Sequence, residues 1–332
     1  MRQVRMVTQS PASEQESSAA AAEVRSTDGP RRSVRGSLNW WQFASFAITH
    51  VVCSWMLAVS RPAGFYRFGR MFGTVEWLIN HKRRRRFVRI LKRILEHEPT
   101  GGQRRRITRE YFMRSRCDRM FYLLFDRMLK CGAADWLTIG NRERFERELS
   151  RGQGVYVALA HEGDHHALGM LFAQTGYPSI GVRDRNEGPL RRFVQERFAR
   201  VYPEVPFPRI LFADAFPREL YRVLRRGDVF MSLMDVARVR AAHQKMQTVR
   251  MFGEDREFVT GPLRIAIRCK SPVFQAFFRP LGNFRYRFDI VGPLLDPGTV
   301  TDEESAVTET LSTYAANVEN FMRDHPELVS RT

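Results

Sequence analysis

The sequence predicts an α/β fold: a central, mostly parallel sheet flanked by helices, with an N-terminal membrane-associated helix. From about residue 150, short apolar runs typical of buried strands alternate with segments of helical periodicity, an order that favours parallel strands with helices on both faces. Before that region, residues 40–60 form an uncharged segment of about 21 residues, which is long enough to cross a bilayer as a helix.

Composition divides the chain into four predicted regions. Residues 1–38 are rich in Ser, Ala, Arg and Gln and are expected to be a disordered basic tail. An apolar stretch close to the start is absent, so a cleaved secretory signal is not expected. We expect residues 39–64 to be a membrane anchor helix, 65–149 a basic helical region and 150–332 an α/β domain.

The anchor segment has features of a membrane interface at both ends. Trp40 and Trp41 begin it and Trp55 lies near its end, and tryptophan is enriched at bilayer boundaries. More Lys and Arg follow the segment than precede it, above all in the run 82–86, which favours a downstream domain on the cytoplasmic side. Two alternatives stay open: a helix that lies in the interface without crossing, and a buried core helix.

Helical periodicity continues through the basic region. Apolar residues at 87, 90, 91, 94 and 95 follow i, i+3, i+4 spacing, with Arg and Lys on the other face. A second helix is predicted from about residue 104 to 129, after a Pro-Thr-Gly-Gly break at 99–102. A basic face resting on anionic lipid explains why these charges share one sign, and a solvated helix face is the alternative.

The α/β region contains seven predicted strands, at residues 154–160, 179–182, 209–212, 229–234, 247–252, 273–278 and 284–291. Helices are predicted at 165–174, 190–200, 218–225, 263–270 and 307–323. In open sheets of this kind, reactive groups collect just beyond the carboxyl ends of the strands. A functional site is therefore expected at that edge.

The net charge is +18, from 54 Lys and Arg against 36 Asp and Glu, so an anionic partner is expected. Nucleic acid, anionic phospholipid and an acidic carrier protein all fit this charge. The arginine run lacks the interleaved aromatic residues of a single-strand binding surface and follows an apolar segment, which favours lipid over nucleic acid. The four cysteines show neither a CxxC pair nor metal-ligand spacing and are expected to be free thiols.

The densest group of reactive side chains is the loop HEGDHH at 161–166, directly after the first of these strands. One chemistry that it fits is acyl transfer, in which His161 takes a proton from an attacking hydroxyl while Asp164 or Glu162 orients the ring. The other is a metal site. The remaining histidines form no pattern of distal ligands, so neither a metal nor another cofactor is expected.

Four segments, in order, resemble the late lipid A (lauroyl/myristoyl) acyltransferase family, within the lysophospholipid acyltransferase-like group. They are HEGDHH at 161–166, in the place of the family's H-x-G-N-W-E loop, VRDRN at 182–186, LRRGDV at 224–229 with LMD at 233–235, and VRMFG at 249–253 with TGP at 260–262. The resemblance covers residues 150–295. It implies a sheet with helices on both faces, and transfer of a fatty acyl chain from acyl carrier protein or coenzyme A to a hydroxyl of a lipid A-like glycolipid or lysophospholipid.

Carried over by position, the resemblance makes His161 the general base. The family's acid, five residues later, is replaced by His166, and a histidine cannot supply the negative charge that stabilises a protonated imidazole. Asp164 or Glu162 is therefore expected to take that role. Backbone N–H groups at the start of the following helix are expected to stabilise the tetrahedral oxyanion.

Three further residues are candidates for substrate binding. Arg183 and Arg185 follow the second strand and are predicted to hold a phosphate or a carrier group. Asp235, at the end of an apolar strand, is predicted either to cap the next turn or to line the pocket.

A second hypothesis is a catalytically impaired, acyltransferase-like lipid-binding protein. It rests on His166 in the acid's place and on an end soon after residue 327, where family members usually continue with an aromatic, basic tail. Under either hypothesis the expected partners are an anionic membrane and lipid. The expected location is the bacterial inner (cytoplasmic) membrane, with the catalytic domain on its cytoplasmic side.

Overall fold

The computed structural model describes residues 39–95, 97–183, 188–212, 216–235 and 245–329, which belong to one compact unit. The predicted tail, residues 1–38, and Arg185 lie outside the described residues. The helices are α2 (Trp40–Ile79), α3 (His81–Ile94), α4 (Gly101–Leu123), α5 (Phe125–Lys130), α6 (Arg142–Ser150), α7 (His165–Phe172), α8 (Pro189–Val201), α9 (Phe216–Arg225), α10 (Gly261–Arg268) and α11 (Glu303–Asp324). The strands are β1 (Leu137–Gly140), β2 (Val155–Leu159), β3 (Ser179–Arg183), β4 (Arg209–Phe212), β5 (Val229–Leu233), β6 (Met246–Met251), β7 (Glu254–Val259), β8 (Val273–Gly282) and β9 (Arg285–Leu295).

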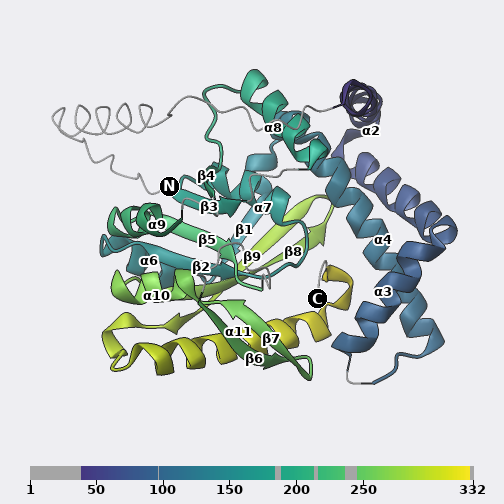
Figure 1. Cartoon of the computed structure of the whole chain (residues 1–332). Helices are drawn as coiled ribbons and strands as arrows, with labels where there is room; N and C mark the ends of the chain where they lie inside the picture. Colours follow the sequence, from purple (N-terminus) through teal and green to yellow (C-terminus); the bar gives the residue numbers. More distant parts are fainter. Residues whose placement is uncertain (1–38, 96, 184–187, 213–215, 236–244, 330–332) are drawn as a thin grey trace, which may run out of the picture. The chain divides into compact units, whose positions relative to one another are not determined.

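Seven strands form one sheet in the order β1-β9-β8-β2-β5-β3-β4, and every neighbouring pair except β8–β9 is parallel (Figure 1). This confirms the predicted α/β fold with a mostly parallel sheet flanked by helices. The predicted strand at 247–252 corresponds to β6, which pairs with β7 in an antiparallel hairpin outside the main sheet. Two strands, β1 and β7, were not predicted. Because β1 belongs to the main sheet, the α/β part of the fold begins before residue 150.

Both faces of the central strand β2 are covered, and its side chains alternate between two cores. Val155, Val157 and Leu159 enter a core that also holds residues of α4, α5, α7 and α8. Tyr156 and Ala158 enter a second core formed with α9, α10 and α11. A parallel strand buried on both faces is apolar throughout rather than alternating, which explains why this strand was recognisable in the sequence.

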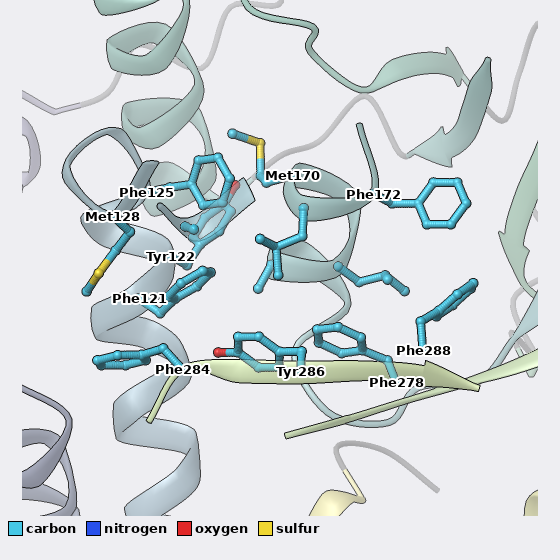
Figure 2. Packing of buried hydrophobic residues seen from close by; sticks show 14 of the residues in the cluster. Phe121, Tyr122, Phe125, Met128, Met170, Phe172, Phe278, Phe284, Tyr286 and Phe288 are labelled. Atoms are coloured by element: carbon cyan, nitrogen blue, oxygen red, sulfur yellow. The ribbon is translucent and has the colours of Figure 1, made fainter. Parts of the chain in front are cut away.

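Aromatic packing joins the helical region to the sheet. Figure 2 shows Phe121, Tyr122 and Phe125 beside the sheet residues Phe278 and Tyr286. The rings of Phe121 and Tyr286 lie 5.3 Å apart, and those of Phe278 and Tyr286 are stacked at 4.8 Å. Aromatic pairs at these separations stabilise a core beyond their buried area, by about 0.5–1.5 kcal/mol each. The helices before the sheet are thus part of the same fold.

The apolar helix α2 is longer than the predicted anchor, since it continues past residue 64 to Ile79. It bends at Arg61, whose φ of 60° is non-helical, directly before Pro62. Proline has no amide hydrogen and commonly kinks a helix. Among the described residues, α2 is long and apolar enough to span a membrane, and only 17% of its most apolar window is buried. That low burial does not fit the alternative of a buried core helix.

Two glycines allow the second half of α2 to approach α4 closely. A Cβ atom at Gly73 would lie 2.4 Å from Met113 Cα, and one at Gly69 would lie 2.8 Å from Cys117 Sγ. Small residues four positions apart on one helix face let two backbones pack together. The pair therefore fixes α4 antiparallel to α2, with the buried Trp77 indole donating to Thr108 at 3.1 Å.

Candidate active site

The candidate site lies where β2 and β5 end. These strands are parallel neighbours, and their last residues, Leu159 and Leu233, are paired in register. The pairing continues one step further, because Met234 N donates to the Leu159 carbonyl at 2.9 Å. Residues two positions beyond each strand are therefore held side by side.

Those two residues are His161 and Asp235, and they form a hydrogen-bonded pair. His161 Nδ1 lies 2.7 Å from Asp235 Oδ1, and the His161 backbone N–H donates to Asp235 Oδ2 at 2.8 Å. The side chains are 12% and 11% exposed. A carboxylate that holds both the ring and the backbone of one histidine fixes the direction of that ring.

This contact also determines which ring nitrogen can accept a proton. Neutral imidazole has one N–H and one lone pair, and a carboxylate at Nδ1 favours the proton on that atom. Nε2 of His161 then carries the lone pair. The geometry is that of a histidine general base with an acid behind it.

The acid at the ring differs from the two that the sequence favoured. Asp164 caps α7, where its Oδ1 accepts from the backbone N–H groups of His166 and Ala167 at 3.1 and 3.3 Å. Glu162 points into the fold, and its Oε1 accepts from Phe278 N on β8 at 2.7 Å. Both loop carboxylates therefore hold the loop in place, whereas the carboxylate beside the His161 ring comes from β5.

The helix cap also changes the expected origin of the oxyanion donors. The N–H groups of His166 and Ala167 were predicted to stabilise a tetrahedral oxyanion, but they donate to Asp164. A donor that is already bonded to a carboxylate has less capacity for a developing negative charge. The helix start thus orders the loop.

The buried environment of Glu162 favours the neutral, protonated state of its side chain. Its side chain is 3% exposed, and Oε2 has no hydrogen-bond partner among the described residues. Burial raises the pKa of Glu162 well above its usual range, and the nearby Asp235 adds to that shift, while the Phe278 N–H opposes it. The raised pKa of Glu162 favours its protonated form, and the carboxyl group in contact with the His161 ring is that of Asp235.

The loop rests on the C-terminal residues and on a buried arginine of α4. Gly163 N donates to the Leu328 carbonyl at 2.8 Å, and Glu162 forms an isolated bridge with Val329. Arg114, which is 6% exposed, donates to the Glu327 carbonyl at 2.7 Å. The segment that ends the described chain is therefore a structural support of the candidate site.

Burial raises the pKa of two interacting acids, the buried Asp118 of α4 and the half-buried Asp164 of the loop. Asp118 lies on α4, with Arg114 Nη1 at 3.9 Å and the Tyr286 hydroxyl at 3.4 Å. Its pKa is raised by burial, which the charge of Arg114 opposes, and the pKa of Asp164 is raised by burial and by Asp118. Each of the two carboxyl groups therefore takes up a proton more readily than an exposed carboxyl group does.

The other two histidines of the loop extend away from the pair. The ring centroids of His161 and His165 are 5.5 Å apart, and those of His165 and His166 are 4.1 Å apart. His166 lies against Arg191 of α8, whose Nη2 is 2.8 Å from Nδ1, and near Tyr122 of α4. Arg191 was not singled out in the sequence, where it is one of many arginines.

The remaining candidates are only partly described. The backbone of Arg183 ends β3, but its side chain and the whole of Arg185 lie outside the described part, so their predicted role stays a prediction. Among the described residues, no group of three or more His, Cys, Asp or Glu side chains is arranged to hold a metal ion. The site offers acid–base chemistry through His161 and Asp235.

Comparison with known proteins gives a family match and a structural match. The family model described as bacterial lipid A biosynthesis acyltransferase matches residues 44–328. A solved structure, the 1-acyl-sn-glycerophosphate (LPA) acyltransferase PlsC from Thermotoga maritima, is similar at 14% identity and a TM-score of 0.34, over 87% of this chain and 99% of that one. No curated protein sequence matches. Since the family match spans most of the chain, the predicted resemblance is confirmed: this protein belongs to the bacterial lipid A biosynthesis acyltransferase family.

Proposed function

We propose that this acyltransferase moves a fatty acyl group from a thioester donor to a hydroxyl of a lipid, with His161 as general base and Asp235 as its orienting acid. The observation that carries the proposal is the 2.7 Å contact between His161 Nδ1 and Asp235 Oδ1 at the carboxyl ends of two neighbouring strands. Membership of the acyltransferase family supports the reaction type.

In the proposed reaction one proton is transferred twice, first from the acceptor hydroxyl to His161 and then from His161 to the leaving thiolate. Nε2 of His161 takes the proton of the acceptor hydroxyl while its oxygen attacks the thioester carbonyl carbon. The resulting imidazolium is stabilised by the Asp235 carboxylate. When the tetrahedral intermediate collapses, the carbon–sulfur bond breaks and the thiolate takes the proton from Nε2. The products are an ester and a free thiol, and His161 returns to its starting state.

The family and the composition support the proposed donor and acceptor. An acidic acyl carrier protein or coenzyme A is the proposed donor, and a lipid A-like glycolipid or a lysophospholipid is the proposed acceptor. The exposed apolar residues along α2, which include Trp40, Trp41, Trp55 and Val59, support attachment to a membrane. We place the protein at the bacterial inner membrane with the catalytic pair on the cytoplasmic side.

Acyl transfer by the purified chain in detergent micelles tests the proposal. His161→Ala is expected to lower kcat by about 10²–10⁴, the usual contribution of a positioned general base. His97→Ala is the matched control, because His97 is exposed in the connection between α3 and α4. Transfer that is equally fast in the two variants would disprove the role of His161.

The same assay separates the alternative of an impaired, lipid-binding relative. That alternative rests on the lack of an acid at residue 166, and the Asp235 contact supplies a carboxylate from another strand. Wild-type protein that binds lipid but transfers no acyl group from either donor class would favour the alternative.

A further inference from the structure

Five exposed arginines near the start of α4 form a patch that has no acidic partner among the described residues. Within the described ranges, Arg85, Arg89, Arg105, Arg106 and Arg109 are exposed and none of them pairs with an Asp or Glu. Other arginines of the fold do pair, as in the contacts of Arg83 with Glu76 and of Arg264 with Glu304. We call these five unpaired residues the arginine patch.

The arginine patch lines two grooves that share Arg105. The first, of about 770 Å³, lies between the second half of α2 and the first turns of α4, and Arg106 and Arg109 line it. The second, of about 600 Å³, lies between α3 and α4, and Arg85 and Arg89 line it. Guanidinium groups therefore converge on two concave surfaces of a size that admits a phosphate-bearing headgroup.

The acid in the first groove does not neutralise the patch. Glu110 is bound by Arg70 through two hydrogen bonds, of 2.6 and 3.0 Å. Its charge is thus already matched by an arginine outside the patch. The positive charge of Arg105, Arg106 and Arg109 remains available to a ligand.

Apolar side chains lie directly beside these charges. Met71 and Val75 of α2 line the first groove and are 49% and 47% exposed, and Ile79, at the end of the same helix, is 71% exposed. An apolar row next to guanidinium groups matches the acyl region and headgroup of a lipid.

We propose that the arginine patch binds the phosphate of anionic phospholipid headgroups, with Met71 and Val75 in contact with the acyl region. The grooves are built from α2, α3 and α4, and neither His161 nor Asp235 lines them. The site is therefore separate from the catalytic pair. It would hold this end of α2 at the membrane surface whatever the acyl acceptor.

The test uses the full chain in neutral detergent micelles and titrates it with short-chain phosphatidylglycerol, short-chain phosphatidylcholine, inorganic phosphate or an acyl carrier protein. The patch variant is Arg105→Gln/Arg106→Gln/Arg109→Gln. The control is Arg218→Gln/Arg222→Gln/Arg226→Gln, which removes the same charge from exposed positions of α9 and the turn after it. Melting temperatures of both variants establish that they are folded.

Wild-type protein and the α9 control are expected to bind phosphatidylglycerol more tightly than phosphatidylcholine. The patch variant is expected to lose on the order of a hundredfold in affinity at low salt, at roughly fivefold for each arginine near an anionic lipid surface. Equal affinities in patch and control variants would overturn the proposal. Binding of inorganic phosphate as tight as that of the lipid, or loss of carrier-protein binding with lipid binding intact, would overturn it as well.

Discussion

Replacement of Asp235 by Asn tests the catalytic pair most directly, because it removes one charge and keeps the shape of the side chain. The carboxylate accepts from His161 Nδ1 at 2.7 Å and from His161 N at 2.8 Å. An amide has one oxygen in place of the two that accept here, so Asp235→Asn can keep the bond from His161 N, which holds the loop, but turns an N–H donor toward Nδ1. A neutral amide cannot, however, stabilise the positive charge of a protonated imidazole.

The expected magnitude follows from the separation and burial of the two charges. Both side chains are nearly nine-tenths buried. Two unit charges about 4 Å apart attract by about 4 kcal/mol at an effective dielectric constant of about 20. Loss of that attraction in the transition state corresponds to a kcat lower by about a thousandfold, at about 1.4 kcal/mol for each factor of ten.

The assay is steady-state acyl transfer by Asp235→Asn and by a control, Asp255→Asn, in the same micelles. Asp255 is exposed in β7, so its charge can be removed without effect on the pair. The KM for the lipid acceptor is expected to stay close to the wild-type value, because Asp235 acts through His161. A loss in kcat below about tenfold, or an effect confined to KM, would refute this role of Asp235.

Three other changes give distinct expectations. Gly73→Ala is expected to lower stability by about 1–3 kcal/mol, because its Cβ would meet Met113 Cα at 2.4 Å; thermal unfolding checks this against Gly102→Ala, which meets nothing within 4 Å. Glu162→Gln is expected to raise the melting temperature at pH 8 and to leave it unchanged near pH 4. Because the pKa of Glu162 is raised in the folded chain, the folded chain keeps a proton that the unfolded chain releases as the pH rises. The stability of the wild type therefore falls as the pH rises. His166→Glu is expected to change kcat little, because Asp235 already supplies the charge; a large gain in acyl transfer would show that the wild type lacks a competent acid.

The strands around the site could be predicted because burial on both faces makes them apolar runs. β2 and β5 were both recognised in this way, and the HEGDHH loop followed from its place after β2. β1 was missed because it lies within residues 65–149, which were predicted to be helical, and β7 was missed because its sequence, EDREFV, is mostly charged. The anchor was predicted to end at residue 64, close to the kink at Arg61 and Pro62 that divides α2 into two helical segments.

The partner of His161 could not be predicted, because it depends on the order of the strands. Asp235 is 74 residues away from His161 in the sequence, and the two meet only because β5 lies next to β2. One signal was present: Asp235 follows its apolar strand directly, as His161 follows its own. The contact of Arg191 with His166 had no such signal, since it requires α8 to pack over the start of α7.

The strand order also explains how the acid can be lost from the loop while the histidine keeps a carboxylate. β2 and β5 are parallel neighbours in register, so they end at the same edge of the sheet. Asp235, two residues beyond β5, therefore contacts the His161 ring, and no acid from α7 is needed for that contact. Position 166, on the first turn of α7, then no longer has to carry a negative charge. In this chain it carries a histidine that contacts Arg191 of α8 instead. Under the proposed mechanism, the residue at the end of β5 orients His161 as the base, so replacement of the acid in the loop does not by itself indicate an inactive protein.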